Sequence, residues 1–130
     1  MLALFCASIS FGQNLEQHEW KHRVLVIASS EMENIEKQVK VLSKDKDGLE
    51  ERKLVVYKTL PKKFSQGIDN SSWTKNESFF NDIKRKKNSF EVILIGLDGG
   101  VKLRQTQLLT LEKLFILIDG MPMRRAEMRN

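Results

Sequence analysis

A continuous aliphatic run followed by a glycine turn most constrains how this chain can fold. Residues 92–95 read Val-Ile-Leu-Ile, a pattern typical of a strand that is covered on both faces and lies inside a sheet. Residues 98–100, Asp-Gly-Gly, tolerate the positive φ angles of a short hairpin connection. Residues 101–104 then alternate apolar with basic, so Phe90–Arg104 predicts a β-hairpin whose second strand, with an inward apolar face, is an edge.

A second aliphatic run, Val24–Ala28, predicts another central strand. Ser30 and Glu33 follow it in the S-x-x-E pattern of a capping box and predict the start of a helix, which Gly48 ends in a left-handed cap. The apolar stripe of that helix is Met32, Ile35, Val39 and Leu42. Leu54–Tyr57 predicts the next strand, so the order favours a right-handed parallel βαβ unit.

The remaining segments predict a loop and three helices. Leu60–Asn76 contains proline, glycine, asparagine and serines and is typical of a long irregular loop. Glu77–Lys87 predicts a short helix. Thr110 is a suitable N-cap for a helix at Leu111–Gly120, and Pro122 suits the first turn of a short terminal helix.

This order predicts an α/β fold with a mixed central sheet of about four strands flanked by helices. The first two strands run parallel, and the hairpin is added antiparallel beside the first strand. The plan is the thioredoxin-like βαβ-αββα arrangement, and its rival is another small α/β sandwich with mixed strands. The length of 130 residues predicts one domain, at residues 13–130.

Residues 1–12 predict a signal peptide. They carry no acidic or basic side chain and are too few to span a bilayer as a helix. Ser10 and Gly12 are the small residues that a signal peptidase requires, so we expect cleavage after Gly12 and export to the periplasm or beyond, with no transmembrane segment in the mature chain. The alternative is an apolar N-terminus on a cytosolic protein.

Cys6 is the only cysteine and falls within the expected leader. The mature chain would then lack a thiol, which excludes a disulfide, a thiolate nucleophile and a cysteine-ligated metal. His18 and His22 have the i, i+4 spacing that two metal ligands use, but no third ligand stands nearby, so we expect exposed or hydrogen-bonded histidines. We therefore expect no cofactor.

The formal net charge of +5 raises the alternative of a polyanion-binding surface. Lys84–Lys87 is the largest basic cluster, with Lys62-Lys63, Arg124-Arg125 and Arg129 as further cations. Cations also favour a helix C-terminus, and Lys84–Lys87 lies where a predicted helix ends. A solvated helix end is therefore the simpler interpretation.

Three segments, Trp20–Ile27, Leu94–Arg104 and Ile118–Arg124, resemble the bacterial DUDES-type domain family (domain of unknown function 4174). The pieces DGGVKLR and IDGMPMR carry the resemblance in combination, and it covers nearly all of the mature chain. It implies a thioredoxin- or peroxiredoxin-like fold and an exported protein, and relatives that include domains of animal extracellular-matrix and sushi-repeat proteins. Many members read LIGKDG, where this chain has Leu97 in place of the lysine.

A thioredoxin-like fold places its catalytic thiols where the first central strand meets its helix, because a helix N-terminus stabilises a thiolate. Here that position holds Ser29 and Ser30, and the hydroxyl pKa of serine is far too high for the same chemistry. We therefore expect a non-enzymatic exported module that binds a protein or polyanion. An oxidoreductase related to peroxiredoxins, with a site that uses no cysteine, is the alternative from another class.

Five charged residues of the hairpin and the last helices complete the candidate surface with Ser29 and Ser30. They are Asp98, Lys102, Arg104, Asp119 and Arg124. Their functional interpretation is a binding site, and their structural interpretation is turn geometry together with ion pairs that tie the hairpin to the last helix.

Overall fold

The computed structural model describes residues 15–69, 71–85 and 90–129. Its strands are β1 (Arg23–Ser29), β2 (Leu54–Leu60), β3 (Lys63–Gln66), β4 (Thr74–Lys75), β5 (Phe90–Ile95) and β6 (Val101–Gln105). Its helices are α3 (Met32–Leu42), α4 (Lys46–Glu51), α5 (Phe79–Ile83), α6 (Leu111–Asp119) and α7 (Pro122–Arg129), with a 3₁₀ turn at Ser43–Asp45. The strands form one mixed sheet in the order β4-β3-β2-β1-β5-β6.

Strand β1 lies at the centre of the sheet, as its aliphatic run predicts. It pairs in parallel with β2 and antiparallel with β5, and all its residues are buried. Leu25 and Ile27 belong to one hydrophobic core, while Val24, Val26 and Ala28 belong to the other. This alternation explains why the strand reads as a continuous apolar run: both of its faces are covered.

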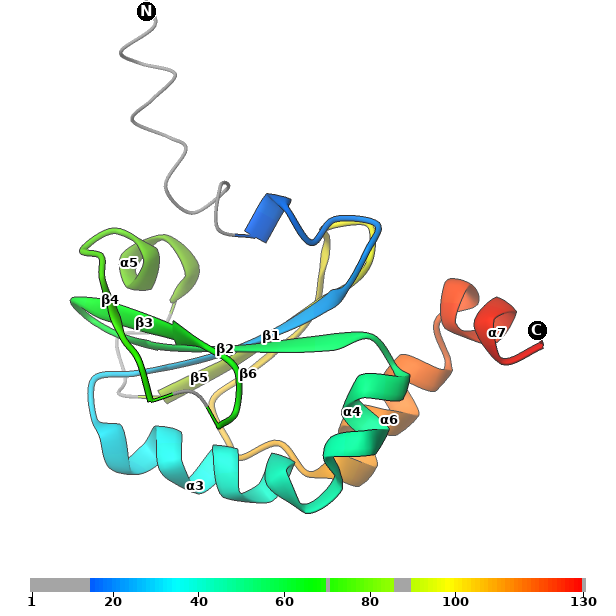
Figure 1. The fold of residues 1–130 in the computed structure, drawn as a ribbon, viewed down its shortest axis with the longest axis horizontal. Helices are drawn as coiled ribbons and strands as arrows, with labels where there is room; N and C mark the ends of the chain where they lie inside the picture. The colour runs from blue at the N-terminus through cyan, green and yellow to red at the C-terminus, as the bar shows by residue number, and fades with distance from the viewer. Residues whose placement is uncertain (1–14, 70, 86–89, 130) are drawn as a thin grey trace, which may run out of the picture.

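Helices cover the two faces of the sheet unequally (Figure 1). The larger core lies between the sheet and α3, α4 and α6, with Ile35, Leu49 and Leu114 as their fully or nearly fully buried contributions. The smaller core lies under α5, where Phe79 contacts Tyr57 of β2 and Phe64 of β3 and joins the inward residues of β1 and β5 in one cluster. Helix α7 extends from the end of α6 at one edge of the molecule.

The predicted hairpin is confirmed. Strands β5 and β6 pair antiparallel, Gly99 has a φ angle of 83°, and the Asp98 Oδ1 accepts a hydrogen bond of 2.9 Å from the Gly100 amide. Strand β6 is an edge of the sheet. The predicted inward face is wrong for Val101, which is 52% exposed, because a register shift opposite Leu94 and Ile95 breaks the alternation of β6.

The sheet has six strands rather than about four. Strands β3 and β4 occupy the segment that the sequence predicts to be an irregular loop. Leu60 pairs with Lys63, so the chain turns at Pro61 and Lys62 and runs back along β2. Both strands are short, mostly polar and bury little, with β4 at the edge of the sheet, so they lack the periodicity that predicts a strand.

The predicted helix boundaries are correct at one end of the chain and wrong at the other. Thr110 Oγ1 accepts a hydrogen bond from the Lys113 amide at the start of α6, and Pro122 begins α7, as expected. The capping box is wrong: α3 begins at Met32 after an N-cap without a side-chain hydrogen bond. Helix α5 ends at Ile83, where the next residue is extended.

Gly48 is not the end of a helix but a buried residue inside α4. Asp45 Oδ1 accepts a hydrogen bond of 2.9 Å from its amide. A Cβ atom at this position would lie 2.6 Å from Asp45 Oδ2 and 2.8 Å from Phe115 Cζ on α6. A side chain at position 48 would therefore have to displace Asp45 or Phe115, so glycine suits the close approach of α4 and α6.

The expected leader at residues 1–12, with Cys6, lies outside the described residues, as do Lys86 and Lys87 of the basic cluster. Across the part of the chain that the structure describes, we found no helix whose length and apolar character would let it cross a membrane.

We expect Gly48→Ala to lower the free energy of unfolding by about 1–3 kcal/mol, because the added methyl group overpacks the α4–α6 contact. Alanine favours an isolated helix over glycine by about 1 kcal/mol, so an increase in stability would contradict this account. Gly120→Ala is the matched control: its Cβ would meet Ile116 O at 3.4 Å and Leu117 O at 3.7 Å, so we expect no loss. Chemical denaturation of the three proteins measures the difference.

Candidate functional site

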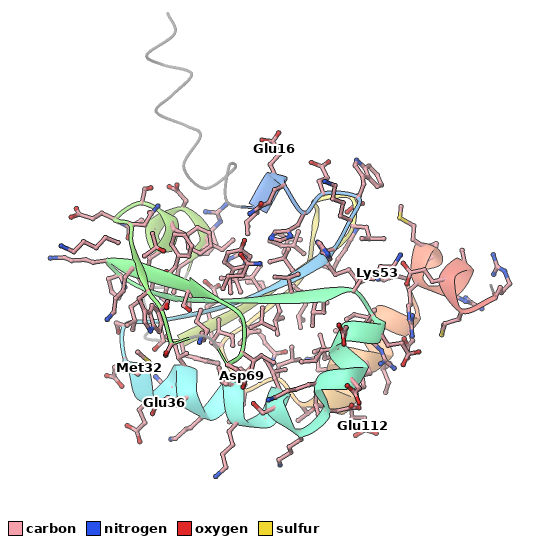
Figure 2. The ribbon with its side chains drawn as sticks, in the orientation of Figure 1. Glu16, Met32, Glu36, Lys53, Asp69 and Glu112 are labelled. Carbon is pink, nitrogen blue, oxygen red and sulfur yellow. The ribbon has the colours of Figure 1, made fainter. Side chains whose placement is uncertain are left out.

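The two ends of β1 lie in different surroundings, and both hold residues that the sequence singles out. At one end, Ser29 is buried and its Oγ accepts hydrogen bonds from the Glu31 amide at 3.0 Å and from Asn34 Nδ2 at 3.3 Å. Figure 2 shows Met32 at this end of the molecule, and Lys53 at the opposite end. The Ser29 hydroxyl therefore organises the start of α3, and Ser30 beside it is exposed.

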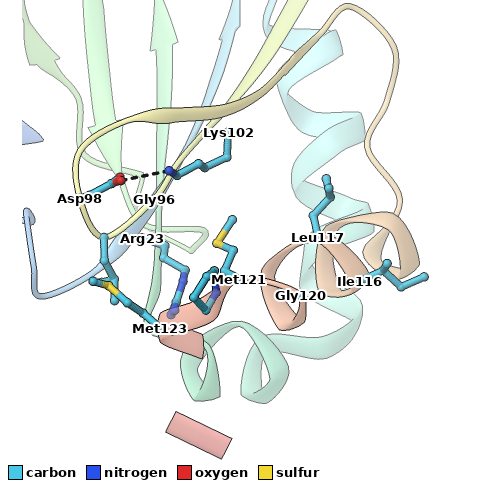
Figure 3. Close-up of a pocket in the computed structure, with 11 residues that line it drawn as sticks. Arg23, Gly96, Asp98, Lys102, Ile116, Leu117, Gly120, Met121 and Met123 are labelled. Carbon is cyan, nitrogen blue, oxygen red and sulfur yellow. Dashed lines mark hydrogen bonds and ion pairs between the residues drawn. The ribbon is translucent and has the colours of Figure 1, made fainter. Parts of the chain in front are cut away.

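At the other end of β1, a cavity of about 600 Å³ opens between the β5–β6 turn and the junction of α6 and α7 (Figure 3). We name it the α6–α7 groove. It is lined by Arg23, Gly96, Leu97, Asp98, Lys102, Ile116, Leu117, Gly120, Met121, Pro122 and Met123. Two segments that lie far apart in the sequence, around DGGVK and IDGMPM, thus meet at one site.

Asp98 and Lys102 form one side of the groove. Their Oδ2 and Nζ atoms are 3.1 Å apart, as the dashed line in Figure 3 marks. The Gly100 amide and the Lys102 ammonium, which donate to this carboxylate, hold the pKa of Asp98 below its ordinary value. Gly96 allows this arrangement, because a Cβ atom there would lie 2.6 Å from Lys102 Cε.

Two exposed apolar side chains line the groove. Among the described residues, six large hydrophobic side chains are exposed, and two of them, Ile116 and Met123, belong to its lining. Ile116 is 65% exposed and Trp20 is 61% exposed. The Trp20 amide donates a 2.7 Å hydrogen bond to Leu97 O, which fixes the turn before β1 against the wall of the groove.

Asp119 lies beside the groove and holds two guanidinium groups. It accepts hydrogen bonds from Arg52 Nε at 3.0 Å, Arg52 Nη2 at 2.9 Å and Arg124 Nε at 2.9 Å. Partial burial alone would raise the pKa of Asp119, but the hydrogen bonds from Arg52 and Arg124 outweigh it and leave that pKa below its ordinary value. The carboxylate therefore joins the end of α4 to α7.

Further ion pairs extend this contact to β1. Glu127 lies 3.4 Å from Arg23 Nη2, 3.9 Å from Lys53 Nζ and 3.5 Å from Arg124 Nη1, while Glu51 lies 3.1 Å from Arg124 Nη2. We name the whole set the Asp119 ion cluster. Its cations are Arg23, Arg52, Lys53 and Arg124, and its carboxylates are Glu51, Asp119 and Glu127. The cluster therefore carries one positive charge in excess.

The five charged residues singled out in the sequence separate into three places. Asp98 and Lys102 pair within the hairpin turn, and Asp119 and Arg124 belong to the ion cluster. Arg104 contacts neither: its Nη1 donates to Ile83 O at 2.8 Å and lies 3.4 Å from the buried Glu91. The predicted ion-pair link between the hairpin and the last helix is therefore wrong. Arg124 is only 4% exposed, because it is buried within the cluster.

Sequence reasoning missed Arg23 and the apolar lining of the groove. Arg23 is the first residue of a fully buried strand, and a charged residue at that position was the available signal. Ile116 and Met123 read as parts of amphipathic helices, and their exposure depends on where α6 and α7 turn away from the sheet.

The histidines are hydrogen-bonded, which is one of the two alternatives that the sequence predicts. His18 is buried, and its Nε2 lies 2.8 Å from the Tyr57 hydroxyl, while its Nδ1 lies 3.1 Å from His22 Nδ1. Burial, with the nearby His22 and Lys21, lowers the pKa of His18. Within the described ranges, no group of three or more potential metal-ligating side chains occurs.

Comparison with known proteins supplies a family but no activity. The family model described as "Domain of unknown function (DUF4174)" matches residues 14–127. No curated protein and no solved structure matches the chain.

Asp119→Asn should destabilise the fold by about 1–3 kcal/mol, because it removes the charge that faces Arg52 and Arg124. This loss of unfolding free energy is smaller than that for a fully buried ion pair, because a third of the Asp119 side chain is exposed to solvent. The control is Asp69→Asn, which breaks an exposed pair with Lys46 and should cost about 0.5 kcal/mol or less.

The same carboxylate makes stability depend on pH. Because the pKa of Asp119 is lower in the folded protein than in the unfolded chain, its contribution is present above the unfolded value of about 3.9 and is lost as the pH falls through the folded value. The unfolding free energy of Asp119→Asn should therefore fall less on acidification than that of the wild type. Equal slopes below pH 4 would contradict this.

Proposed function

Because the chain belongs to the family described as a domain of unknown function (DUF4174), which carries no activity with it, we propose a function from the geometry of the site. The protein is a non-enzymatic binding module, and its α6–α7 groove takes an apolar segment of a partner protein.

One observation carries this proposal: six of the eleven residues that line the cavity are apolar, and two of these, Ile116 and Met123, are among the exposed large hydrophobic side chains of the described residues. Exposed apolar side chains scattered singly need no explanation, but a contiguous set around a concave site is typical of a binding surface. Met121 and Met123 add unbranched, adaptable side chains to the wall, a composition typical of grooves that receive apolar segments.

The chemistry at the other end of β1 supports a non-enzymatic role. The Ser29 hydroxyl is buried and accepts hydrogen bonds from the Glu31 amide and from Asn34 Nδ2, and neither group is a general base. A serine nucleophile needs an adjacent general base, which the buried Ser29 lacks in these contacts. The alternative of a peroxiredoxin-related oxidoreductase therefore has less support than a binding role.

A thioredoxin-like relationship and export belong to the same proposal. The strand order β2-β1-β5-β6 supports the thioredoxin-like relationship, because β2 is parallel to β1, β5 is antiparallel to β1 and β6 is antiparallel to β5. The uncharged, apolar character of residues 1–12 supports export. An exported interaction domain on this scaffold would meet its partner outside the cytosol.

A photo-crosslinking residue in place of Ile116 tests the proposal in cells that produce the protein. We expect discrete adducts that are lost when Met123→Glu is added, because a carboxylate in the groove disfavours an apolar occupant. Leu108 is the matched control, since it is 46% exposed and does not line the groove. Absence of adducts at Ile116, or the same adducts at both positions, would contradict the proposal.

A further inference from the structure

Arg23 is a buried, charged side chain in the wall of the largely apolar α6–α7 groove. Its side chain is 1% exposed and runs from β1 toward α7 within the groove (Figure 3). Nη1 donates to Arg52 O at 2.9 Å, and both terminal nitrogens lie 3.4 Å from Glu127. Nε is buried without a hydrogen-bond partner among the residues that the structure describes.

A buried donor without an acceptor is unfavourable, and native proteins keep few of them. Arg23 is also held by long contacts, since its distances to Glu127 exceed the 2.7–2.9 Å typical of charge-assisted hydrogen bonds. The Asp119 ion cluster, to which Arg23 belongs, has one cation more than it has carboxylates. The groove wall thus offers an unused donor within a region of excess positive charge.

Apart from the paired Asp98 and Lys102 and two glycines, the rest of the lining is apolar. Leu117, Met121 and Met123 share the cavity with Arg23, and Ile116 lies at its exposed side. Methionine side chains have several rotatable bonds, so Met121 and Met123 can rearrange to admit a group to the guanidinium. A ligand that fits must combine an apolar body with one anionic acceptor.

We propose that the α6–α7 groove binds the C-terminal end of a partner polypeptide, with the terminal carboxylate on Arg23 and an apolar last side chain among Ile116, Met121 and Met123. This rests on the proposed function and names the part of the partner that the groove takes. An internal peptide segment can supply a carboxylate only from an Asp or Glu side chain, whereas a C-terminus supplies a carboxylate in the same residue as its apolar side chain.

The surface beyond the groove favours a polypeptide over a small apolar acid. Trp20 is 61% exposed, and its backbone amide donates to Leu97 O in the groove wall, so an exposed aromatic residue lies beside the cavity. A chain that leaves the groove can contact this residue, but a short free acid cannot extend beyond the cavity.

Peptides with free C-termini, selected from a random display library on the purified protein, test the proposal. Each selected peptide is then synthesised as the free acid and as the C-terminal amide, and binding is measured by fluorescence anisotropy. We expect apolar last residues and at least about tenfold weaker binding of the amide, because the amide removes the negative charge that faces Arg23. This comparison needs no variant and is independent of any effect of Arg23 on folding.

Two variants separate this proposal from the proposed function. Ile116→Glu should weaken binding of the free acid at least about tenfold, and Leu108→Glu should leave it unchanged within about twofold. Equal affinity of acid and amide, with Ile116→Glu still disruptive, would overturn the carboxylate site and leave the groove as a binding site. Failure to select any peptide, or binding that Ile116→Glu does not affect, would overturn both. Saturable binding of decanoate without binding of peptides would overturn the proposal in favour of a lipid ligand.

Discussion

The structure depends on the complete burial of β1 between β2 and β5. The aliphatic residues of this strand divide between the two cores, so the helices on both faces pack against the same central strand. Burial extends to Arg23 at its first position, and a guanidinium removed from water requires acceptors. Those acceptors come from the end of α4 and from α7, which explains how two segments remote in sequence are held at this end of the sheet.

The same requirement shapes the candidate site. Asp119 at the end of α6 and Glu127 on α7 both face cations of the ion cluster, so the direction of α7 is set by charge rather than by an extensive apolar contact. Because α7 leaves the sheet here, Ile116 and Met123 stay exposed and the α6–α7 groove remains open beside the hairpin turn. The ion cluster and the open α6–α7 groove thus both depend on one buried arginine.

The sequence predicts the interior better than the periphery, for physical reasons. Strands β1 and β5 are covered on both faces and so carry unbroken aliphatic runs. Asp98-Gly99-Gly100 forms a turn whose conformation follows from its own residues, so it can be predicted without tertiary contacts. Strands β3 and β4 bury too little to show a period. The prediction that Gly48 ends a helix is wrong because this glycine lies inside α4 and faces Phe115 of α6, a contact that no local sequence pattern indicates.

The candidate site shows the same limit. Both motifs that line the groove could be recognised in the sequence, but the sequence did not predict that they lie next to each other in the fold. Arg104 and Arg124 read alike as basic residues of a surface, yet one contacts α5 and the other is buried against Asp119. Charge partners across long sequence separations depend on the fold, so pairing could not be predicted before the strands and helices were placed.

Hydrogen exchange of the protein with and without a bound peptide tests most directly which end of β1 is functional. The account predicts slower amide exchange in the groove segments, residues 96–102 and 116–123, on binding and no change at residues 29–32. Protection confined to residues 29–32, with the groove unaffected, would contradict it.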